Sequence, residues 1–515
     1  MKKIKIKNLR SLVDTGYIEL KPLTIVVGKN SSGKSTFIRS LPLIKQTVET
    51  RTKDPILWYS NRLVDFGSFK ESINRTNTNG NINFSFEFDL SKRNLLTRHM
   101  YHIRGFYEYN NFESNTSEIK LSIDCNSESI QNLQLTVDGQ KIEVYKEGKS
   151  GKMINKLRIN GRDIADEFSD INPSNFGTSF LPIYITTGNK YNENVDIYFR
   201  AKLTTLLKNM SYKTTSSKTI ENLIDNLKFG TSKELLKNIK NLSTTAKKLK
   251  QNLSALSIDD VIFQEIRDYF VGMHINLLIS SCNNYIEQYF HNLQYIAPVR
   301  ASAERYYRLQ GISLDEIDSR GENLPMIIHN MSQAQKRKFS TWTKDYFGFH
   351  IETSISGGHT SLQLIYENGD KINLADTGFG YSQILPIVLS MWKYTNIRKR
   401  DGFRNSNKMY TLVIEQPELH LHPAFQGKLV DTFIDVIKLC KEKDIDIKII
   451  IETHSETIVN KVGYLIAKKE FESDNVNILI FNNQQNPYDT KIEKANYDTE
   501  GILERWPIGF FNMEV

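Results

Sequence analysis

The strongest constraint on the fold of this 515-residue chain is a short run near its start, "GKNSSGKST" at residues 28–36. The run fits the pattern G-x-x-x-x-G-K-[ST], with the apolar stretch "LTIVV" before it and the helical stretch "STFIRSLPLIKQ" beginning inside it. Glycines let backbone N–H groups curve round phosphate oxygens, and a helix N-terminus adds positive potential there. The sequence therefore predicts a strand, a phosphate-binding loop and a helix in an α/β domain.

The residues of this loop have expected parts in binding a nucleoside triphosphate. Lys34 would reach the β and γ phosphates, and Ser35 would place its hydroxyl on Mg²⁺. A glycine turn beside a surface lysine is the alternative, and the strand and helix around the run disfavour it. We expect ATP and Mg²⁺ as cofactors, with phosphate-binding residues Gly28, Lys29, Asn30, Ser31, Ser32, Gly33, Lys34, Ser35 and Thr36.

Two further apolar runs end in residues that suit the same chemistry. "MYTLVIE" ends at Glu415, and such an acid at a strand end would hold Mg²⁺ through water together with Ser35. The attacking water also needs a base or an orienting group, and Gln416 and Glu418 follow directly. The second run, "IKIIIET", is followed by His454, which we expect to sense the γ-phosphate.

Gln416 stands where a second acid would help most. An amide can orient water but cannot accept its proton at neutral pH. Two outcomes stay open: Glu418 or His454 acts on the water, or hydrolysis is slow and the ATP-bound state persists. The second outcome suits a sensor or clamp better than a motor.

The chain outside these motifs predicts two other kinds of structure. "NINFSFEFDL", "IKLSIDC" and "LQLTVDG" alternate as strands of an antiparallel β lobe do. Residues 196–295 have the apolar spacing of helices. "TSLQLIYENGDKINLAD" predicts a hairpin with its turn at "NGD", and "NVNILIF" predicts a last strand.

Composition and two weaker motifs set limits on other functions. The net charge of +8 allows a nucleic-acid partner without requiring one. Three distant cysteines and the lack of an apolar run of ~18 residues favour a reducing cytoplasm and no membrane span. Zinc at His420 and His422 of "HLHP" is disfavoured because no cysteine or further histidine is near in sequence. "DIDIK" resembles a nuclease D-x-D, but it precedes a strand, so a solvated turn is favoured.

Four pieces, "GKNSSGKST", "LADTGFGYSQILPIVL", "LVIEQPELHLHP" and "IIIETHSETIV", resemble in this order the ABC-type ATPases of the SMC, RecF and OLD kind, and especially their short, armless bacterial relatives. The resemblance implies an α/β fold, an ABC-type P-loop ATPase head with an antiparallel β lobe and a helical insertion. The implied parts are the N-terminal half of the head with the P-loop (1–95), the rest of the β lobe and the helical insertion (96–360), the C-terminal half of the head with a signature-like loop, Walker B and the switch histidine (361–483), and a tail (484–515).

The resemblance also implies a dimer. "TGFGYSQ" would take the place of the signature loop, which in such proteins faces the γ-phosphate bound by the opposite subunit. Gly378 and Gly380 would allow close approach of the backbone, and Ser382 would begin a helix that points at the phosphate. A loop with a helix cap is the plain alternative. ATP would then join two heads in a homodimer or a higher homo-oligomer.

The biological role implied by the resemblance is that of armless ATPases in bacterial defence systems, such as the PtuA-like partner of an HNH nuclease. The chain would be a regulatory or scaffolding subunit of an anti-phage or DNA-surveillance complex, with a separate nuclease or toxin as effector. An OLD-like nuclease or DNA-repair ATPase acting directly on DNA and a non-hydrolysing nucleotide-bound scaffold are the alternatives. We expect no added nuclease domain after His454, because only about sixty residues of this sequence follow it.

Two surface features have both a functional and a structural interpretation. The ending "WPIGFF" offers Trp506, Phe510 and Phe511 as a docking patch, although packing onto the head explains it more simply. The lysine-rich helices within 196–260 could touch DNA, although a solvated helix face is the simpler interpretation.

Overall fold

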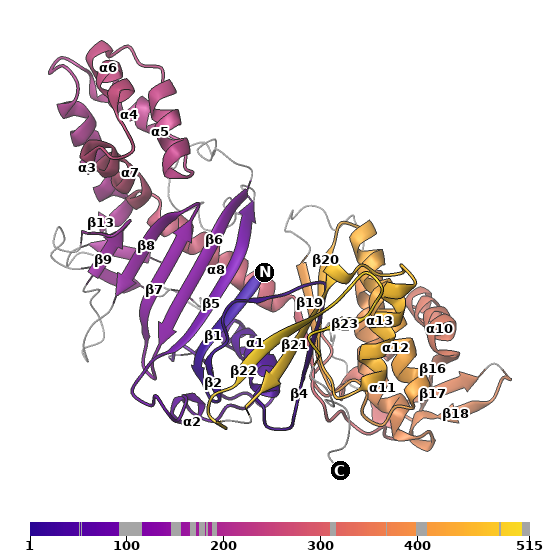
Figure 1. Ribbon diagram of the computed structural model, residues 1–515. Coiled ribbons are helices and arrows are strands. Elements are labelled where there is room, and N and C mark those ends of the chain that lie inside the picture. The colour runs from indigo at the N-terminus through magenta and orange to yellow at the C-terminus, as the bar shows by residue number, and fades with distance from the viewer. Residues whose placement is uncertain are drawn as a thin grey trace.

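The computed structural model describes residues 1–50, 52, 54–91, 116–145, 156–164, 171–174, 181, 184–187, 193–309, 316–366, 368–397, 409–483 and 486–506. Figure 1 shows a core of strands and helices, a β lobe beside it and a group of helices that projects from the far end of the β lobe. None of the helices that the structure describes is long and apolar enough to cross a membrane.

The core is a seven-stranded sheet of order β14-β19-β20-β4-β21-β22-β23. The first five strands are parallel neighbours, and the last two are antiparallel additions. Their apolar sequences suit strands that are covered on both faces. The strands are β4 (Leu23–Gly28), β14 (Leu293–Ile296), β19 (Met409–Glu415), β20 (Asp446–Glu452), β21 (Val476–Asn482), β22 (Lys491–Tyr497) and β23 (Leu503–Glu504).

Helices cover the two faces of this sheet unequally. α1 (Lys34–Glu49) packs on the face that presents Val26, Val413 and Ile450. α11 (Phe379–Thr395), α12 (Pro423–Glu442) and α13 (Glu456–Ala467) pack on the face that presents the alternate residues Ile25, Ile414 and Ile451. The phosphate-loop helix and the helix after the signature-like loop therefore lie on opposite faces of one sheet (Figure 1).

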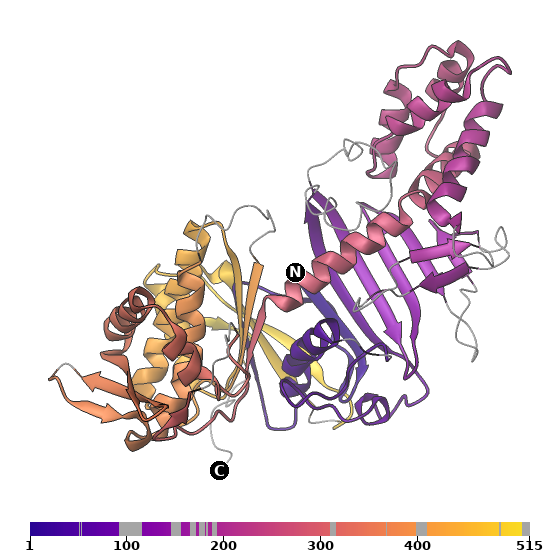
Figure 2. The ribbon, with the colours of Figure 1, turned by 180° about the vertical axis from the view of Figure 1, so that it is seen from behind.

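The β lobe is a nine-stranded sheet of antiparallel neighbours. The predicted lobe is confirmed, and the N-terminal strands join it as well. α8 (Ile275–His291) crosses it and leads back to the core (Figure 2), and its Tyr285 stacks on Phe88 with ring centroids 4.0 Å apart. The strands are β1 (Lys3–Leu9), β2 (Leu12–Asp14), β3 (Ile18–Glu19), β5 (Ile82–Ser91), β6 (Thr116–Cys125), β7 (Ile130–Val137), β8 (Gln140–Tyr145), β9 (Lys156–Ile159) and β10 (Arg162–Asp163).

The projecting helices form what we call the helical lobe, residues 195–272. They are α3 (Val195–Asn209), α4 (Ser217–Asp225), α5 (Ser232–Asn241), α6 (Lys247–Ala255) and α7 (Val261–Gly272). Together with α8 they confirm the helices predicted for residues 196–295. Side-chain caps begin α4 and α5: at α5 the Thr231 hydroxyl accepts from the Glu234 N–H, and the Glu234 carboxylate accepts from the Thr231 N–H.

A smaller four-stranded sheet precedes the signature-like loop. It consists of β15 (Tyr307–Arg308), β16 (Phe349–Ser356), β17 (His359–Tyr366) and β18 (Lys371–Asn373), flanked by α9 (Leu324–Asn330) and α10 (Gln333–Phe347). The hairpin predicted at "NGD" is confirmed, because β17 and β18 pair antiparallel across it. The remaining elements are α2 (Phe69–Ser72), β11 (Ile171–Ser174), β12 (Tyr184–Thr187) and β13 (Glu193–Asn194).

Candidate nucleotide-binding site

The predicted phosphate loop lies between β4, which ends at Gly28, and α1, which begins at Lys34. Gly33 has φ 95°, and a Cβ there would lie 2.6 Å from Thr490 Oγ1 and 2.7 Å from Ser11 Oγ, so only glycine fits. Thr490 also donates from its hydroxyl to the carbonyl of Ser32 at 3.0 Å. The turn before β22 therefore supports the loop from behind.

The loop lysine is folded back over the loop that it follows. The Lys34 ammonium donates to the carbonyls of Gly28 at 2.8 Å and Lys29 at 2.7 Å. Burial lowers its pKa, and nearby Glu452 opposes that effect. The exposed stretch Lys29, Asn30 and Ser31 leaves the rim of the loop open to a ligand. An open rim and a buried lysine ammonium are features of a loop that binds phosphate.

The acid closest to the loop serine was not among the predicted residues. Ser35 Oγ donates to Glu452, at 3.1 Å from Oε1 and 3.0 Å from Oε2. Glu452 ends β20, which lies directly beside β4, whereas β19 with Glu415 is one strand further away. A hydroxyl facing a buried carboxylate is a set of hard oxygen donors that suits Mg²⁺. The run "IKIIIE" carried the signal, since it ends in an acid just as "MYTLVIE" does.

Glu415 is buried and held by three donors. Arg39 Nε and Nη2 each donate at 2.8 Å to Oε1 and Oε2 respectively, and the Tyr295 hydroxyl donates to Oε1 at 2.6 Å. Its hydrogen bond to Glu415 is the main cause that raises the pKa of Arg39. Glu415 and Glu452 are paired in register on neighbouring strands. Burial, and next the charge of Glu415, raise the pKa of Glu452 to about 7.

The residues after Glu415 take three different positions. Gln416 has φ 45°, in the left-handed region, and its N–H donates to the Glu452 carbonyl at 2.8 Å. Glu418 accepts from Thr453 Oγ1 at 2.9 Å and from the His454 N–H at 2.7 Å, so both its carboxylate oxygens hold the end of β20. Its pKa is raised, chiefly by burial. This carboxylate therefore holds the Thr453 hydroxyl and the backbone N–H of His454.

His454 follows β20 and is exposed. Burial of part of its ring and the charge of Lys34 lower its pKa. His454 thus comes two residues after β20, which pairs directly with the strand that leads into the phosphate loop.

The signature-like loop differs from the expectation in where its helix begins. α11 begins at Phe379 with Gly378 as its N-cap, so Ser382 is the fourth helical residue and not the first. Ser382 is 9% exposed, and its hydroxyl donates to the Phe379 carbonyl at 2.8 Å inside the helix. Phe379 is 63% exposed instead. A Cβ at Gly380 would lie 2.9 Å from the His420 carbonyl, which explains a glycine there.

One buried arginine connects this helix to the end of β19. The Gln383 carboxamide pairs with the Arg300 backbone, accepting from N at 3.3 Å and donating to O at 3.1 Å. The Arg300 guanidinium in turn donates to the Glu415 carbonyl at 2.7 Å. Within the described part of the chain, Arg300 Nε and Nη1 have no hydrogen-bond partner. Burial lowers the Arg300 pKa to about 10.

The remaining sequence candidates take structural positions. His422 is the N-cap of α12, and its Nδ1 accepts from the Ala424 N–H at 3.2 Å. Asp446 of the D-x-D begins β20, at the opposite end of that strand from Glu452. Trp506 packs against the core, while Phe510 and Phe511 lie outside the described residues.

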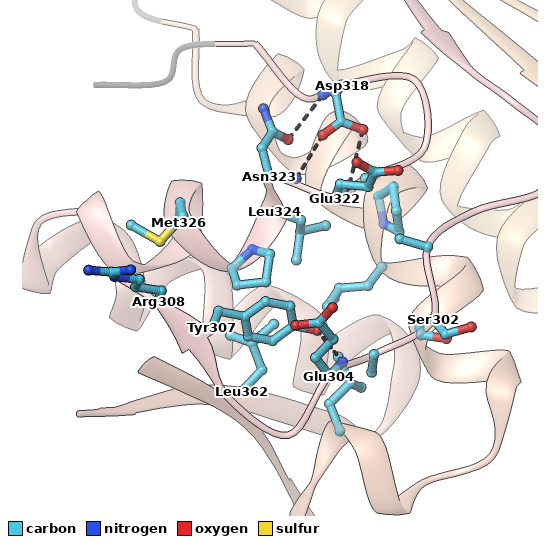
Figure 3. A pocket seen from close by; sticks show the side chains of 18 residues that line it. Ser302, Glu304, Tyr307, Arg308, Asp318, Glu322, Asn323, Leu324, Met326 and Leu362 are labelled. Carbon is cyan, nitrogen blue, oxygen red and sulfur yellow. Dashed lines mark hydrogen bonds between the residues drawn. The ribbon is translucent and has the colours of Figure 1, made fainter. Parts of the chain in front are cut away.

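A separate cavity of ≈ 690 Å³ adjoins α11 on the side of the small sheet (Figure 3). Tyr307, Leu324 and Leu362 line it, together with Ser382 of α11, whereas the phosphate-loop and strand-end residues do not. The Asp318 carboxylate at its edge accepts from backbone N–H groups of its own loop, including that of Asn323 at 2.7 Å. The cavity is therefore distinct from the nucleotide site.

A model of the AAA ATPase domain family matches residues 1–459 of the chain. The chain belongs to this AAA ATPase family. A search of curated proteins finds no match. Among solved structures, the chain is similar to an SMC head domain from Pyrococcus furiosus, bound to the C-terminal domain of ScpA, with 12% identity over 96% of each chain and a TM-score of 0.35. An SMC head domain from Thermotoga maritima matches with 10% identity over 96% of this chain and 97% of that chain, and a TM-score of 0.34.

Membership of the AAA ATPase family makes the chain an ATP-using enzyme. The family match extends over the phosphate loop, Glu415 and Glu452, and it ends within α13. The expected α/β ATPase head is confirmed.

Proposed function

We propose that this AAA ATPase is an ATP-gated clamp in which two copies pair by sandwiching nucleotide between the phosphate loop of one and the signature-like loop of the other. The placement of α1 and α11 on opposite faces of the core sheet carries the proposal. Within one molecule the sheet separates α1 from α11. A second molecule is therefore needed to bring the start of its α11 to the phosphate bound by the first.

The surface at the start of α11 supports pairing. Phe379 is 63% exposed at the first helical position, and no atom within 4 Å would meet a Cβ at Gly378. Free N–H groups of the first turn can donate to an anion that arrives from outside. An exposed aromatic residue beside them would be buried when a partner arrives.

Pairing is tested by light scattering with Mg²⁺ and a non-hydrolysable ATP analogue. Phe379→Asp should remain monomeric, because it places a carboxylate and its hydration shell in the seam. Ile502→Asp is the matched control, since Ile502 is 60% exposed in the loop before β23. Nucleotide affinity of the single head should stay the same in both variants. Normal pairing of Phe379→Asp would refute the signature role.

We further propose that hydrolysis is slow, so that the paired state persists. Gln416 supports this, because its amide can orient water but cannot accept a proton. Both oxygens of Glu418 already hold the end of β20. His454 is then the remaining candidate among the four predicted catalytic residues for receiving the proton. Such an enzyme suits a regulatory or scaffolding subunit better than a motor.

The proposed setting is an anti-phage or DNA-surveillance complex in the cytoplasm, with a separate nuclease or toxin as effector. The helical lobe supports a nucleic-acid partner. Between residues 206 and 256 its exposed charged residues are nine lysines and one acid, Glu221. Asp225 is paired with Arg200 at 2.7 Å, and Glu234 caps α5. The nine are Lys208, Lys213, Lys218, Lys233, Lys237, Lys240, Lys247, Lys248 and Lys250.

Duplex DNA binding measured over a range of salt tests this partner. Each phosphate contact contributes a slope of about −0.9 to log K against log salt. Replacing Lys237, Lys240, Lys247 and Lys250 by glutamine should weaken binding and flatten that slope. Lys441→Gln and Lys468→Gln in the core are the controls. An unchanged slope in the four-lysine variant would remove the helical lobe as the contact surface.

Direct cleavage of DNA by this chain is the second candidate. The D-x-D motif that suggested it lies at the far end of β20 from the phosphate loop. Incubation of the purified chain with duplex DNA and Mg²⁺ or Mn²⁺ tests it, and the expected result is no cleavage. Copurification of a nuclease or toxin with the tagged chain would support the effector proposal.

A further inference from the structure

We propose that Glu452 is the carboxylate that holds the divalent metal together with Ser35, and that Glu415 is a positioning residue clamped by Arg39 and Tyr295. This inference rests on the nucleotide site proposed above and changes which acid serves it. The sequence pattern pointed to Glu415 because that acid precedes "QPE" at the end of an apolar strand.

The hydroxyl of the loop serine identifies the metal acid. In a phosphate loop of this type the serine hydroxyl is itself placed on Mg²⁺, so the carboxylate that shares its hydrogen bond lies next to the metal position. Ser35 Oγ lies 3.1 and 3.0 Å from the two oxygens of Glu452. No hydrogen bond joins Ser35 to Glu415 in the described part of the chain.

The order of the strands explains this arrangement. β20 pairs with β4 through Glu452 and Val26, so Glu452 ends its strand beside the strand that leads into the loop. β19 pairs with β20 on the other side, and Glu415 is in register with Glu452. An acid at the end of the middle strand is therefore nearer to Ser35 than an acid at the end of the outer strand.

The donors around Glu415 already satisfy its charge. Arg39 binds both oxygens in a forked pair at 2.8 Å, and Tyr295 donates to one of them at 2.6 Å. Such paired charge-assisted bonds fix both the position and the direction of a carboxylate. A metal-bound water would have to share a carboxylate that already accepts three hydrogen bonds.

The hydrogen bonds at Glu415 link α1 and β14 to the end of β19. Arg39 lies on α1, one helical turn after Ser35, and Tyr295 lies on β14. β14 leads into Arg300, which connects the Glu415 carbonyl to Gln383 on α11. Glu415 is thus connected both to the phosphate-loop helix and, through Arg300 and Gln383, to the helix after the signature-like loop. Such a place suits a positioning role.

Binding of Mn²⁺ by the complex with a non-hydrolysable ATP analogue, followed by electron paramagnetic resonance, separates the two acids. Glu452→Gln should weaken Mn²⁺ binding roughly 10–100-fold, since loss of a carboxylate near a metal commonly has that effect. Its melting temperature without nucleotide should be unchanged, because a glutamine can still accept from Ser35. Glu415→Gln should do the opposite: the melting temperature falls and Mn²⁺ affinity is retained.

Tyr295→Phe removes one donor to Glu415 and keeps the acid, so it serves if Glu415→Gln does not fold. It should keep Mn²⁺ affinity. Weakened Mn²⁺ binding in Glu415→Gln or Tyr295→Phe, with Glu452→Gln like the parent, would overturn the proposal. Loss in both acid variants would also overturn it, because the acids would then act as joint ligands. Lys34→Ala distinguishes failure of this proposal from failure of the proposed nucleotide site. ATP affinity equal to the parent would refute the nucleotide site itself.

Discussion

The hydrogen bonds between Gln383 and Arg300 give a prediction about stability. Replacing the neutral Gln383 should destabilise the protein more than replacing the charged Arg300. Gln383→Leu keeps the side-chain volume but leaves the Arg300 N–H and C=O without the partners that they have at 3.3 and 3.1 Å. Each buried backbone group left unpaired costs roughly 1–3 kcal/mol, so the two together cost about 2–6 kcal/mol. Arg300 is 3% exposed and Gln383 is 5% exposed, so water does not replace these bonds.

Arg300→Met should destabilise the chain less. It removes the 2.7 Å bond from the guanidinium to the Glu415 carbonyl, which is worth about 1.5–3 kcal/mol. It also removes a cation that the site disfavours. Burial lowers the Arg300 pKa from 12.5 to about 10, which corresponds to about 3 kcal/mol against the charged form. The two contributions are of opposite sign and similar size, so the net change should be close to zero.

Thermal unfolding of the nucleotide-free variants checks this order. For a chain of 515 residues, about 2–6 kcal/mol corresponds to a fall in melting temperature of roughly 2–6 °C for Gln383→Leu, and Arg300→Met should change it by less than about 1 °C. Ser390→Ala is the control on the same helix, because it removes one buried hydroxyl that donates to the Pro386 carbonyl at 2.8 Å. If Arg300→Met melts as low as Gln383→Leu, the guanidinium is better satisfied than its unpaired Nε and Nη1 indicate, and the reasoning fails.

Four further substitutions test the phosphate loop, the residue after Glu415 and the start of α11. Lys34→Ala should abolish productive ATP binding by calorimetry, because it removes the cation at the terminal phosphates; affinity equal to the parent would contradict the loop assignment. Gln416→Glu should raise steady-state phosphate release by ~10²-fold if proton transfer limits the rate, and a slower variant would mean that the amide is needed for geometry. Gly380→Ala should destabilise the protein by roughly 1–3 kcal/mol, since its Cβ would lie 2.9 Å from the His420 carbonyl, whereas Gly378→Ala meets no atom within 4 Å and should melt like the parent.

The elements that could be predicted are those whose signal is local. The strand, loop and helix around "GKNSSGKST" follow from short-range pattern, and the NGD hairpin follows from turn chemistry. The helices of residues 196–295 follow from apolar spacing. The start of α11 was displaced by three residues, because Gly378 caps the helix and Ser382 is buried one turn later.

The residues that could not be predicted depend on strand order. Nothing in the order of the chain places β20 between β4 and β19, so Glu415 was the only acid predicted for the metal, and the contact between Ser35 and Glu452 was not predicted. Tyr295 and Arg300 join the site from β14 and the loop after it, far away in sequence. Arg39 had a weak signal, since it follows Ser35 by four residues and so shares its face of α1.

The position of Gln416 explains why an amide and not an acid stands there. Its φ of 45° is a conformation that costs a non-glycine residue roughly 1–2 kcal/mol, and its N–H is bonded to the carbonyl of Glu452. A glutamate at Gln416 would add a third carboxylate beside Glu415 and Glu452, where the charge of one acid already raises the pKa of the other. Arg39 already binds both oxygens of Glu415, so it would have to share its charge with a further acid. An amide at Gln416 keeps the backbone hydrogen bond to Glu452 without that added charge, which agrees with the slow hydrolysis proposed above.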